Sequence, residues 1–315
     1  MNKFYVDFLD AIQRGPVQRR TIFKTGAESI YQDGRLVCGS EITTPDLTEN
    51  ITLEPHLVLF GCGHVGKALY DLAVLQGMRV TIFDSRAELL TAQRFPLATR
   101  IVGPYDETLS KDYPSFVSPY YCIFTHGHNH DQECLLYALH RKHSYIGMIG
   151  SRAKVDHCLQ NIKAMGITEP MLSKLHSPIG LPINAVTPQE IAISIMAEII
   201  STFRRDKTTI TIDPSLLAQA AANDGVMVRI VQKQGSVPQS IGSMLYVTPT
   251  AIYGTVGGGA LENHAINQAR TILLHLQSST THILEHHTLT ESQQLSMTCG
   301  GNTTLLYKVY LNTIH

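Results

Sequence analysis

The 315-residue chain has almost no net charge, no long apolar run and no tryptophan. Its net charge of −1 at pH 7 argues against a general nucleic-acid binder or a protein that binds anionic membranes. The most apolar helical stretch, 191–200, is interrupted by Glu198 and is far shorter than the ~20 residues that span a bilayer. The first residues, MNKFYVDFLDAIQRG, carry acids early and lack an apolar segment, so we expect no secretory signal.

Paired cysteines are also absent. The six cysteines are scattered through the chain and form no C-x-x-C pair. This distribution predicts reduced thiols in a cytoplasmic protein, and it argues against a disulfide framework or a zinc ribbon. The cysteines are Cys38, Cys62, Cys122, Cys134, Cys158 and Cys299.

The composition is that of a soluble globular chain, with 43% hydrophobic and 16% charged residues. Residues 1–53 are expected to be an N-terminal adjunct, with strands at 18–23 and 36–38 and a polar linker at 41–50. Residues 54–206 form one predicted domain and residues 207–315 a second, smaller one.

Short apolar runs and helical stretches alternate between residues 54 and 206. The expected strands are 57–60, 80–83, 100–102, 120–124 and 145–149; the expected helices start near 65 and cover 131–142, 153–165 and 188–203. Thr187, Pro188 and Glu190 predict a capping box for the last helix. This alternation indicates an α/β domain with a parallel sheet, whose ligands bind beyond the carboxyl ends of the strands.

Residues 207–315 show a different pattern. Asp213-Pro214 predicts a short helix to Ala222, and strand-like runs follow at 226–231, 244–247 and 252–256. A helix is expected over 260–276, with further strands at 282–286 and 304–310. Consecutive strands with short turns favour an antiparallel sheet, and hence a smaller α+β domain rich in glycine turns.

The sequence Gly61-x-Gly63-x-x-Gly66 follows a predicted strand, opens a predicted helix and precedes Asp84 by about twenty residues. This context is typical of a Rossmann-like dinucleotide turn, in which a pyrophosphate approaches the helix N-terminus and the acid binds the ribose. The alternative for the ribose end is a 2′-phosphate held by Ser85 and Arg86. The alternative is a glycine cluster that packs the fold and binds nothing.

The segment 125–131, THGHNHD, follows the fourth predicted strand of this domain. His126, His128, His130 and Asp131 invite a metal site, and the order only partly matches the T-H-x-H-x-D-H loop of metallo-β-lactamase-like hydrolases. The alternative is that the histidines line a ligand cleft while Asp131 caps the next helix.

Three further turns are candidates for ligand contacts. Gly150-Ser151-Arg152 would form an anion site at a helix start, or an ordinary cap with a solvated arginine. Gly257-Gly258-Gly259 would cradle a phosphate or form a tight strand–helix junction, where Glu262 offsets the helix dipole. Cys299-Gly300-Gly301 would present an accessible thiol, or hold a buried and inert one.

Taken together, these segments resemble a known family. FGCGHVGKAL, FDSR, RFP, THGHNHD, YIGMIGSRAK, PIGLPI and TPQEIAISIMAEI resemble the Rossmann-type domain of the XdhC/CoxI family, and GSVPQSIGSML, YGTVGGGALE and MTCGG resemble its other domain. Two features depart from that family: the two domains occur in reversed order, and Gln239 stands where the G-S-x-P-R loop has arginine.

The resemblance implies a maturation factor for molybdenum hydroxylases, which binds molybdenum cofactor and assists its sulfuration and insertion. The implied partners are an apo molybdenum hydroxylase and a cofactor-sulfurating enzyme. Since no residue stands out as a catalytic acid, base or nucleophile, a carrier or chaperone is favoured over an enzyme, and the glycine-rich faces are compatible with a homodimer.

Two alternatives remain, an NAD(P)-dependent oxidoreductase and a metal-dependent hydrolase that uses the HGHNHD loop. The residues expected to contact the cofactor are Gly61, Gly63, His64, Gly66, Asp84, Arg86, His126, His128, Asp131, Ser151, Arg152, Gly257, Gly258, Gly259, Glu262, Cys299 and Gly300.

Overall fold

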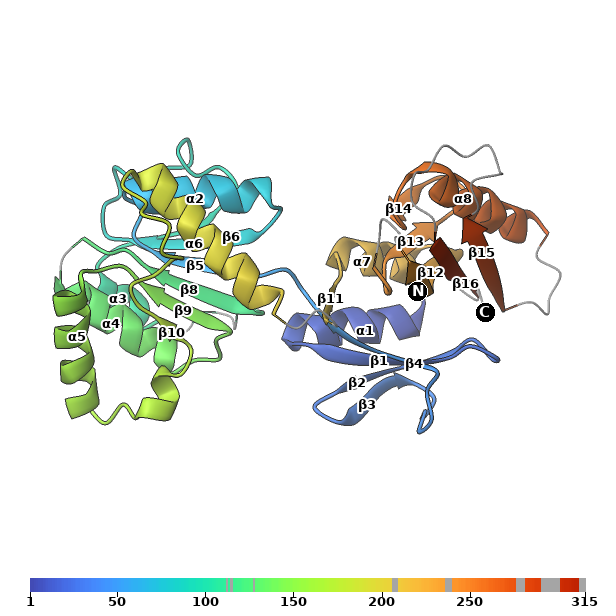
Figure 1. Ribbon diagram of the computed structural model, residues 1–315, viewed down its shortest axis with the longest axis horizontal. Helices are drawn as coiled ribbons and strands as arrows, with labels where there is room; N and C mark the ends of the chain where they lie inside the picture. Colours follow the sequence, from blue (N-terminus) through green and yellow to red (C-terminus); the bar gives the residue numbers. More distant parts are fainter. Residues whose placement is uncertain are drawn as a thin grey trace. The chain divides into compact units, whose positions relative to one another are not determined.

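The structure is a computed structural model in which two compact units are formed, one by Glu54–Lys207 and one by Met1–Leu53 together with Thr208–His315 (Figure 1). It describes residues 1–111, 113, 116–126, 128–205, 209–235, 240–275, 281–289 and 301–311; the side chains at 128, 129, 152, 154, 288 and 289 are not described. We call the two units the Rossmann unit and the split unit.

The Rossmann unit contains a six-stranded sheet in the order β10-β9-β8-β5-β6-β7. Every neighbouring pair is parallel. If the six strands are numbered 1 to 6 along the chain, their order across the sheet is 6-5-4-1-2-3. Read from the other edge this is 3-2-1-4-5-6, the strand order of the Rossmann fold, and its switch point lies between β5 and β8. The strands are β5 (His56–Phe60), β6 (Arg79–Asp84), β7 (Thr99–Val102), β8 (Pro119–Ile123), β9 (Tyr145–Met148) and β10 (Leu175–His176).

Helices cover both faces of this sheet (Figure 1). On one face, α2 (His64–Leu75) and α6 (Pro188–Phe203) pack over the apolar side chains of β5 and β6. On the other face lie α3 (Tyr105–Leu109), α4 (His128–Leu139) and α5 (Arg152–Ala164), with the short 3-10 helix η1 (Glu169–Leu172). The central strands are therefore buried on both sides, which explains their continuous apolar sequences.

The capping box predicted for α6 is confirmed. The Thr187 hydroxyl accepts from the Glu190 N–H at 3.3 Å, and the Glu190 carboxylate accepts from the Thr187 N–H at 2.9 Å. The helix begins at Pro188 and ends at Phe203, as its sequence indicates. The predicted α/β class with a parallel Rossmann-like sheet is likewise confirmed.

The split unit contains two five-stranded sheets, in the orders β11-β4-β1-β2-β3 and β14-β13-β12-β16-β15. The first comprises β1 (Val17–Ile22), β2 (Ala27–Gln32), β3 (Arg35–Gly39), β4 (Leu47–Thr52) and β11 (Thr209–Thr211). The second comprises β12 (Gly225–Gly235), β13 (Met244–Val247), β14 (Ile252–Gly254), β15 (His282–Leu289) and β16 (Gly301–Tyr310), and all its pairs are antiparallel.

Three helices complete the split unit: α1 (Lys3–Arg14), α7 (Pro214–Ala222) and α8 (Gly259–Leu274). The α8 helix packs Leu261, Ala265 and Ala269 onto the apolar side chains of β12, β13 and β16. The α1 helix contacts α7, and the Asn2 N–H donates to the Ala221 carbonyl at 2.8 Å.

A buried ion network joins the two sheets of the split unit. The Arg19 guanidinium on β1 donates to Glu49 on β4 at 2.7 and 2.9 Å, and Arg229 on β12 donates to the same carboxylate at 2.7 Å. Arg229 also pairs with Glu28 on β2, which accepts from the Tyr310 hydroxyl at 2.6 Å. Arg229 is 1% exposed, so its charge depends on carboxylates supplied by residues 1–53.

Residues 1–53 therefore differ from the expected adjunct. The segment 41–50, expected to be a linker, includes the start of β4, and the N-terminal helix α1 was not anticipated. The signal for α1 was present, since its buried residues Tyr5, Phe8, Ala11 and Ile12 recur at helical spacing. Among the described residues, no helix is both long and apolar enough to cross a bilayer.

Candidate functional site

The glycine turn after β5 has the geometry that its sequence predicts. Gly61 has φ +115°, and a Cβ there would lie 2.4 Å from the Phe124 carbonyl oxygen. A Cβ on Gly66 would lie 2.2 Å from the Gly61 carbonyl oxygen. Both positions therefore require glycine for packing, because the α2 helix and the end of β8 approach the turn too closely for a side chain.

Gly63 differs from both, because a Cβ there would meet nothing within 4 Å. It is the N-cap of α2, where the first-turn N–H groups have no partner within the helix. Exposed backbone at a helix N-terminus is suited to a phosphate, which needs close approach to N–H groups. His64, the first residue of α2, is exposed beside it.

Asp84 ends β6 and is 1% exposed. Its carboxylate accepts from the Cys62 N–H at 2.7 Å and the Arg86 N–H at 2.9 Å. The Arg86 guanidinium donates to both oxygens, at 2.9 and 2.7 Å. Burial opposes ionisation of Asp84, but the hydrogen bonds from Arg86 and Cys62 outweigh it and lower the pKa to about 2.

These four hydrogen bonds occupy both carboxylate oxygens of Asp84. The acid and the arginine that the sequence offers to a ribose or a 2′-phosphate thus bind one another. Asp84 also fixes the glycine turn, since it holds the backbone of Cys62. The Cys62 thiol is fully buried, and burial together with Asp84 raises its pKa to about 12, which makes it an inert thiol.

The loop after β8 lies against the glycine turn, as the close approach of Gly61 to Phe124 shows. The buried Asp131 carboxylate accepts from the Thr125 hydroxyl at 2.5 Å and from its N–H at 3.2 Å. Asp131 therefore closes the loop onto α4 through Thr125, but it lies in the first turn of the helix and not at the N-cap that the sequence suggested. His126 is exposed at the bend of the loop, and the side chain of His128 lies outside the described residues.

His130 connects this loop to the end of β6. Its ring lies 5.1 Å from the ring of Tyr105, whose hydroxyl donates to the Phe83 carbonyl at 3.2 Å. The His130 Nδ1 lies 3.1 Å from Glu133 on the same helix. The structure thus gathers three loops at the carboxyl end of the sheet, 61–66, 84–86 and 124–131, which we call the switch-point loops.

The Gly150-Ser151-Arg152 turn follows β9, the strand beside β8. The Ile149 N–H donates to the Ile123 carbonyl at 3.0 Å, which sets this turn next to the loop after β8. Ser151 is exposed, and its carbonyl accepts from the Val155 N–H at 3.0 Å, as expected at a helix start. The side chain of Arg152 lies outside the described residues.

A groove of about 300 Å³ runs along α2 and α6, with His64 in its lining. Lys67 and Arg94 contribute positive charge there, although Lys67 pairs with Asp71 at 2.5 Å and Arg94 donates to the Leu89 carbonyl at 3.2 Å. The volume is at the lower limit of small-molecule pockets.

The glycine turn of the split unit does not present a free anion cradle. The Glu262 carboxylate accepts from the Val256 N–H at 2.9 Å, the Gly258 N–H at 3.1 Å and the Thr255 hydroxyl. Burial alone would raise the pKa of Glu262, but these hydrogen bonds have the larger effect and lower it. Glu262 thus occupies the position that a bound anion would take, as a helix-start acid. Gly257, Gly258 and Gly259 have φ of +120°, +71° and +63°.

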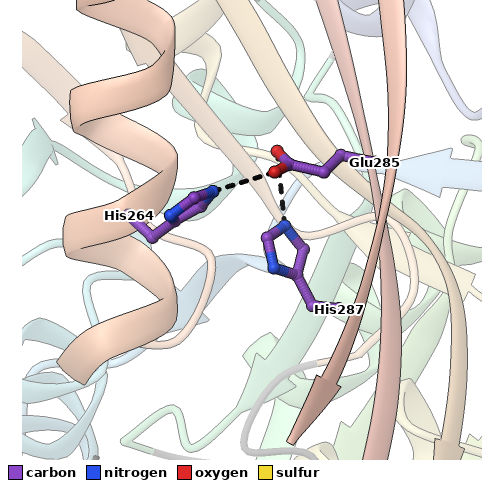
Figure 2. Close-up of side chains that lie close together, drawn as sticks. All are labelled: His264, Glu285 and His287. Atoms are coloured by element: carbon purple, nitrogen blue, oxygen red, sulfur yellow. Dashed lines mark hydrogen bonds and ion pairs between the residues drawn. The ribbon is translucent and has the colours of Figure 1, made fainter. Parts of the chain in front are cut away.

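One cluster in the split unit was missed by sequence reasoning. Among the described side chains, His264, Glu285 and His287 are the group of His, Cys, Asp or Glu residues whose ligand atoms all lie within 4.8 Å of one another (Figure 2). The available signal was Glu285-x-His287 in a strand, where alternate residues share a face. Cys299 and Gly300 lie outside the described residues.

Comparisons with known proteins agree with this geometry. Residues 57–199 match the family described as the XdhC Rossmann domain, and residues 218–284 match the XdhC and CoxI family. A crystal structure of a protein named xanthine dehydrogenase from Bacillus halodurans shares 26% identity with a TM-score of 0.50, over 64% of this chain and 62% of that one.

Two curated relatives are similar over part of their length. YqeB, an uncharacterized protein of Escherichia coli, is 28% identical over 228 residues, which is 71% of this chain and 39% of YqeB. A protein of Bacillus subtilis named as a probable xanthine dehydrogenase component is 32% identical over 163 residues, 52% of this chain and 47% of that protein. The chain spans less than half the length of either relative. With its parallel sheet, its glycine turn and matches in both units, the chain belongs to the XdhC and CoxI family.

Proposed function

We propose that this chain is an accessory factor for a molybdenum-containing hydroxylase of the xanthine dehydrogenase type. In this role it binds the phosphate-bearing molybdenum cofactor and assists its sulfuration and its insertion into the apo-enzyme. The partners are then the apo-hydroxylase and a cofactor-sulfurating enzyme. Membership of the XdhC and CoxI family and the name of the Bacillus subtilis relative support the connection to this class of enzyme.

The observation that carries the proposal is the open backbone at Gly63. Gly61 and Gly66 are required by packing, whereas no packing contact requires Gly63. The fold therefore does not need glycine at this N-cap, which follows the first strand of the Rossmann unit. A ligand whose phosphate contacts the backbone would explain why the side chain is absent. His64 would add a hydrogen-bond donor beside that phosphate.

The rest of the cofactor would lie along the switch-point loops. His126 is the exposed side chain of the loop after β8, and Ser151 is exposed at the neighbouring turn. The bound molybdenum centre would supply the group that is sulfurated, while the chain would hold the pterin and exclude competing ligands. A carrier role is favoured because Cys62, the thiol within the glycine turn, is buried with its pKa raised.

The strand order and the glycine turn also favour a second candidate, an NAD(P)-dependent oxidoreductase. The state of Asp84 argues against it, because its four hydrogen bonds leave little capacity for ribose hydroxyls. Binding of such a cofactor would require Arg86 to release the carboxylate.

Gly63→Ala provides the test. The methyl group would meet no protein atom, so we expect a normally folded protein that binds the ligand at least about 10-fold more weakly, equivalent to about 1.4 kcal/mol. The experiment mixes purified chain with molybdenum cofactor released from a molybdenum enzyme and measures co-eluting pterin by fluorescence after oxidation. Gln160→Ala, an exposed change on α5, is the matched control.

The same protein is titrated with NADH and NADPH. Pterin co-elution at micromolar affinity that Gly63→Ala weakens and Gln160→Ala preserves supports the proposal. Nicotinamide binding with that pattern and no pterin binding would replace it by the oxidoreductase. If neither ligand binds, the cofactor-carrier proposal is rejected.

A further inference from the structure

The split unit holds a second group of chemically active side chains, outside the Rossmann unit. His264 lies in the second turn of α8, and Glu285 and His287 lie two residues apart on β15. Figure 2 shows the two imidazole rings approaching the carboxylate from the helix and from the strand. Glu285 and His287 share the sheet face of Ile283, which packs in the apolar layer beneath α8.

The distances in this cluster suit a small cation. The His264 Nε2 lies 3.0 Å from Glu285 Oε1, and the His287 Nε2 lies 3.4 Å from Glu285 Oε2. Tetrahedral coordination with metal–ligand bonds of ~2.1 Å places neighbouring ligand atoms about 3.4 Å apart. Both imidazoles direct Nε2 towards the same carboxylate (Figure 2), and the three ligand atoms all lie within 4.8 Å of one another, so an ion would draw them together to contact all three.

The surroundings carry more polar atoms than the described chain satisfies. Glu285 Oε2, His287 Nε2, Thr303 Oγ1 and the Tyr307 hydroxyl are all buried; Glu285 Oε2 and His287 Nε2 face each other at a long 3.4 Å, and Thr303 Oγ1 has no hydrogen-bond partner among the described residues. Thr303 is the cross-strand partner of His287 on β16, and Tyr307 lies on the same face. Buried polar atoms are rarely left with incomplete hydrogen bonding, so this group at the edge of an apolar layer favours a bound partner.

We propose that His264, Glu285 and His287 bind a divalent transition-metal ion of the zinc type. Two imidazoles and one carboxylate are ligands that zinc takes where it keeps one coordination position open. The His264 side chain is 47% exposed, so the fourth position faces solvent and can take water or a small anion. Calcium and magnesium prefer all-oxygen ligands and fit this set poorly.

The test measures metal binding by the full chain without an affinity tag. Metal is removed with a chelator, the protein is titrated with Zn²⁺ against a chromophoric competitor, and stoichiometry is determined by elemental analysis. Parallel titrations with Co²⁺, Mn²⁺ and Mg²⁺ give the selectivity. We expect one Zn²⁺ per chain, weaker Co²⁺, still weaker Mn²⁺ and no competition by Mg²⁺.

Three variants locate the ion: His264→Ala, Glu285→Gln and His287→Ala. Each is expected to weaken Zn²⁺ binding by more than the ~10- to 100-fold that loss of an outer-shell partner costs. His286→Ala is the matched control, because His286 neighbours the site in sequence but bonds Thr304 at 2.9 Å on the other face of the strand. Circular dichroism of every apo variant verifies folding.

The variants distinguish a specific site from adventitious metal binding. One equivalent of Zn²⁺ that is lost in the three variants and kept in His286→Ala supports the site. The chain has fifteen histidines, so binding that His286→Ala weakens equally, or that the three variants leave intact, is adventitious and overturns the proposal. No binding at micromolar Zn²⁺, or a preference for Mg²⁺, overturns it as well.

Discussion

At the scale of single residues, the two glycine turns share one property. In each, a carboxylate of the chain itself accepts hydrogen bonds from backbone N–H groups, Asp84 from Cys62 and Arg86, and Glu262 from Val256 and Gly258. The sequence predicted the residue types and their spacing. It did not predict that these carboxylates are already engaged, because that depends on side-chain conformations such as the reach of Arg86 back to Asp84.

Asp84→Asn tests the engagement of the carboxylate. The folded-state pKa of Asp84 is about 2 against an ordinary value of 3.8, so its ionised form stabilises the fold by about 2 kcal/mol. A lowered pKa means that this contribution is complete above pH 4 and is lost as the pH falls towards 2. We therefore expect the variant to be less stable at pH 7, with the difference from wild type shrinking on acidification.

The measurement is urea unfolding of the full chain, followed by circular dichroism from pH 7 to pH 3 and read on the transition of the Rossmann unit. Asp71→Asn is the control, since Asp71 is an exposed partner of Lys67 and such pairs contribute little. A difference between wild type and Asp84→Asn that stays constant with pH contradicts the role given to the carboxylate.

At the scale of elements, the strongly patterned segments were predictable. The bounds predicted for α6 and β13 agree with the structure. A capping box marks the start of α6, and a compact apolar run marks β13. The mistaken linker at 41–50 shows where sequence-based prediction of strands fails. Exposed and buried residues largely alternate along β4, and the segment forms a strand by pairing with β1. Pairing between distant segments leaves little trace in the local sequence.

Glu262→Ala tests how α8 begins. The carboxylate accepts two N–H groups and one hydroxyl, and its loss leaves the Thr255–Gly258 turn without a partner for them. Hydrogen bonds to a charged group contribute ~1.5–3 kcal/mol, so we expect a loss of about that size in the unfolding free energy of the split unit. Hydrogen exchange at residues 256–259 should accelerate, and denaturant unfolding gives the free energy.

Glu262→Gln keeps one acceptor oxygen and should lose less stability. Asn263→Ala, an exposed change one residue further on, should lose almost none. Equal effects of Glu262→Ala and Asn263→Ala would show that the carboxylate does not hold the turn.

At the scale of the molecule, the split unit is built from both ends of the chain. Strand β11 pairs in parallel with β4, with Thr209 opposite Asn50, and Arg229 takes its counter-charges from Glu28 and Glu49. The expected smaller domain of residues 207–315 lacks these partners. Family resemblance locates a domain but not the strand that a distant segment adds to it, so this arrangement was beyond sequence reasoning.

Fragments of the chain test this arrangement. Residues 54–207 should fold alone, with dispersed amide resonances and cooperative unfolding, because both faces of their sheet are covered within the fragment. Residues 208–315 alone should not, because Arg229 would be buried without a partner, at a cost of ~3–5 kcal/mol, in a unit that also lacks β4.

Residues 1–53 joined to 208–315 through a flexible linker should recover a cooperative transition. That chimera is also the control for the failure of the shorter fragment. Cooperative unfolding of residues 208–315 alone, with stability close to that of the chimera, would contradict the dependence on residues 1–53.

The pairing of Arg229 with Glu49 has a consequence for biosynthesis. About 180 residues separate the two, and at ~5–20 residues per second the ribosome needs roughly 10–35 s to make them. During that interval the Rossmann unit emerges and can fold, while the edge of β4 lacks its partner strand β11, and Arg19 and Glu49 lack their third charge. Nascent chains of this protein are therefore expected to expose the unpaired edge of β4 for roughly 10–35 s, which makes residues 47–52 the segment that a chaperone acting during translation would be expected to protect.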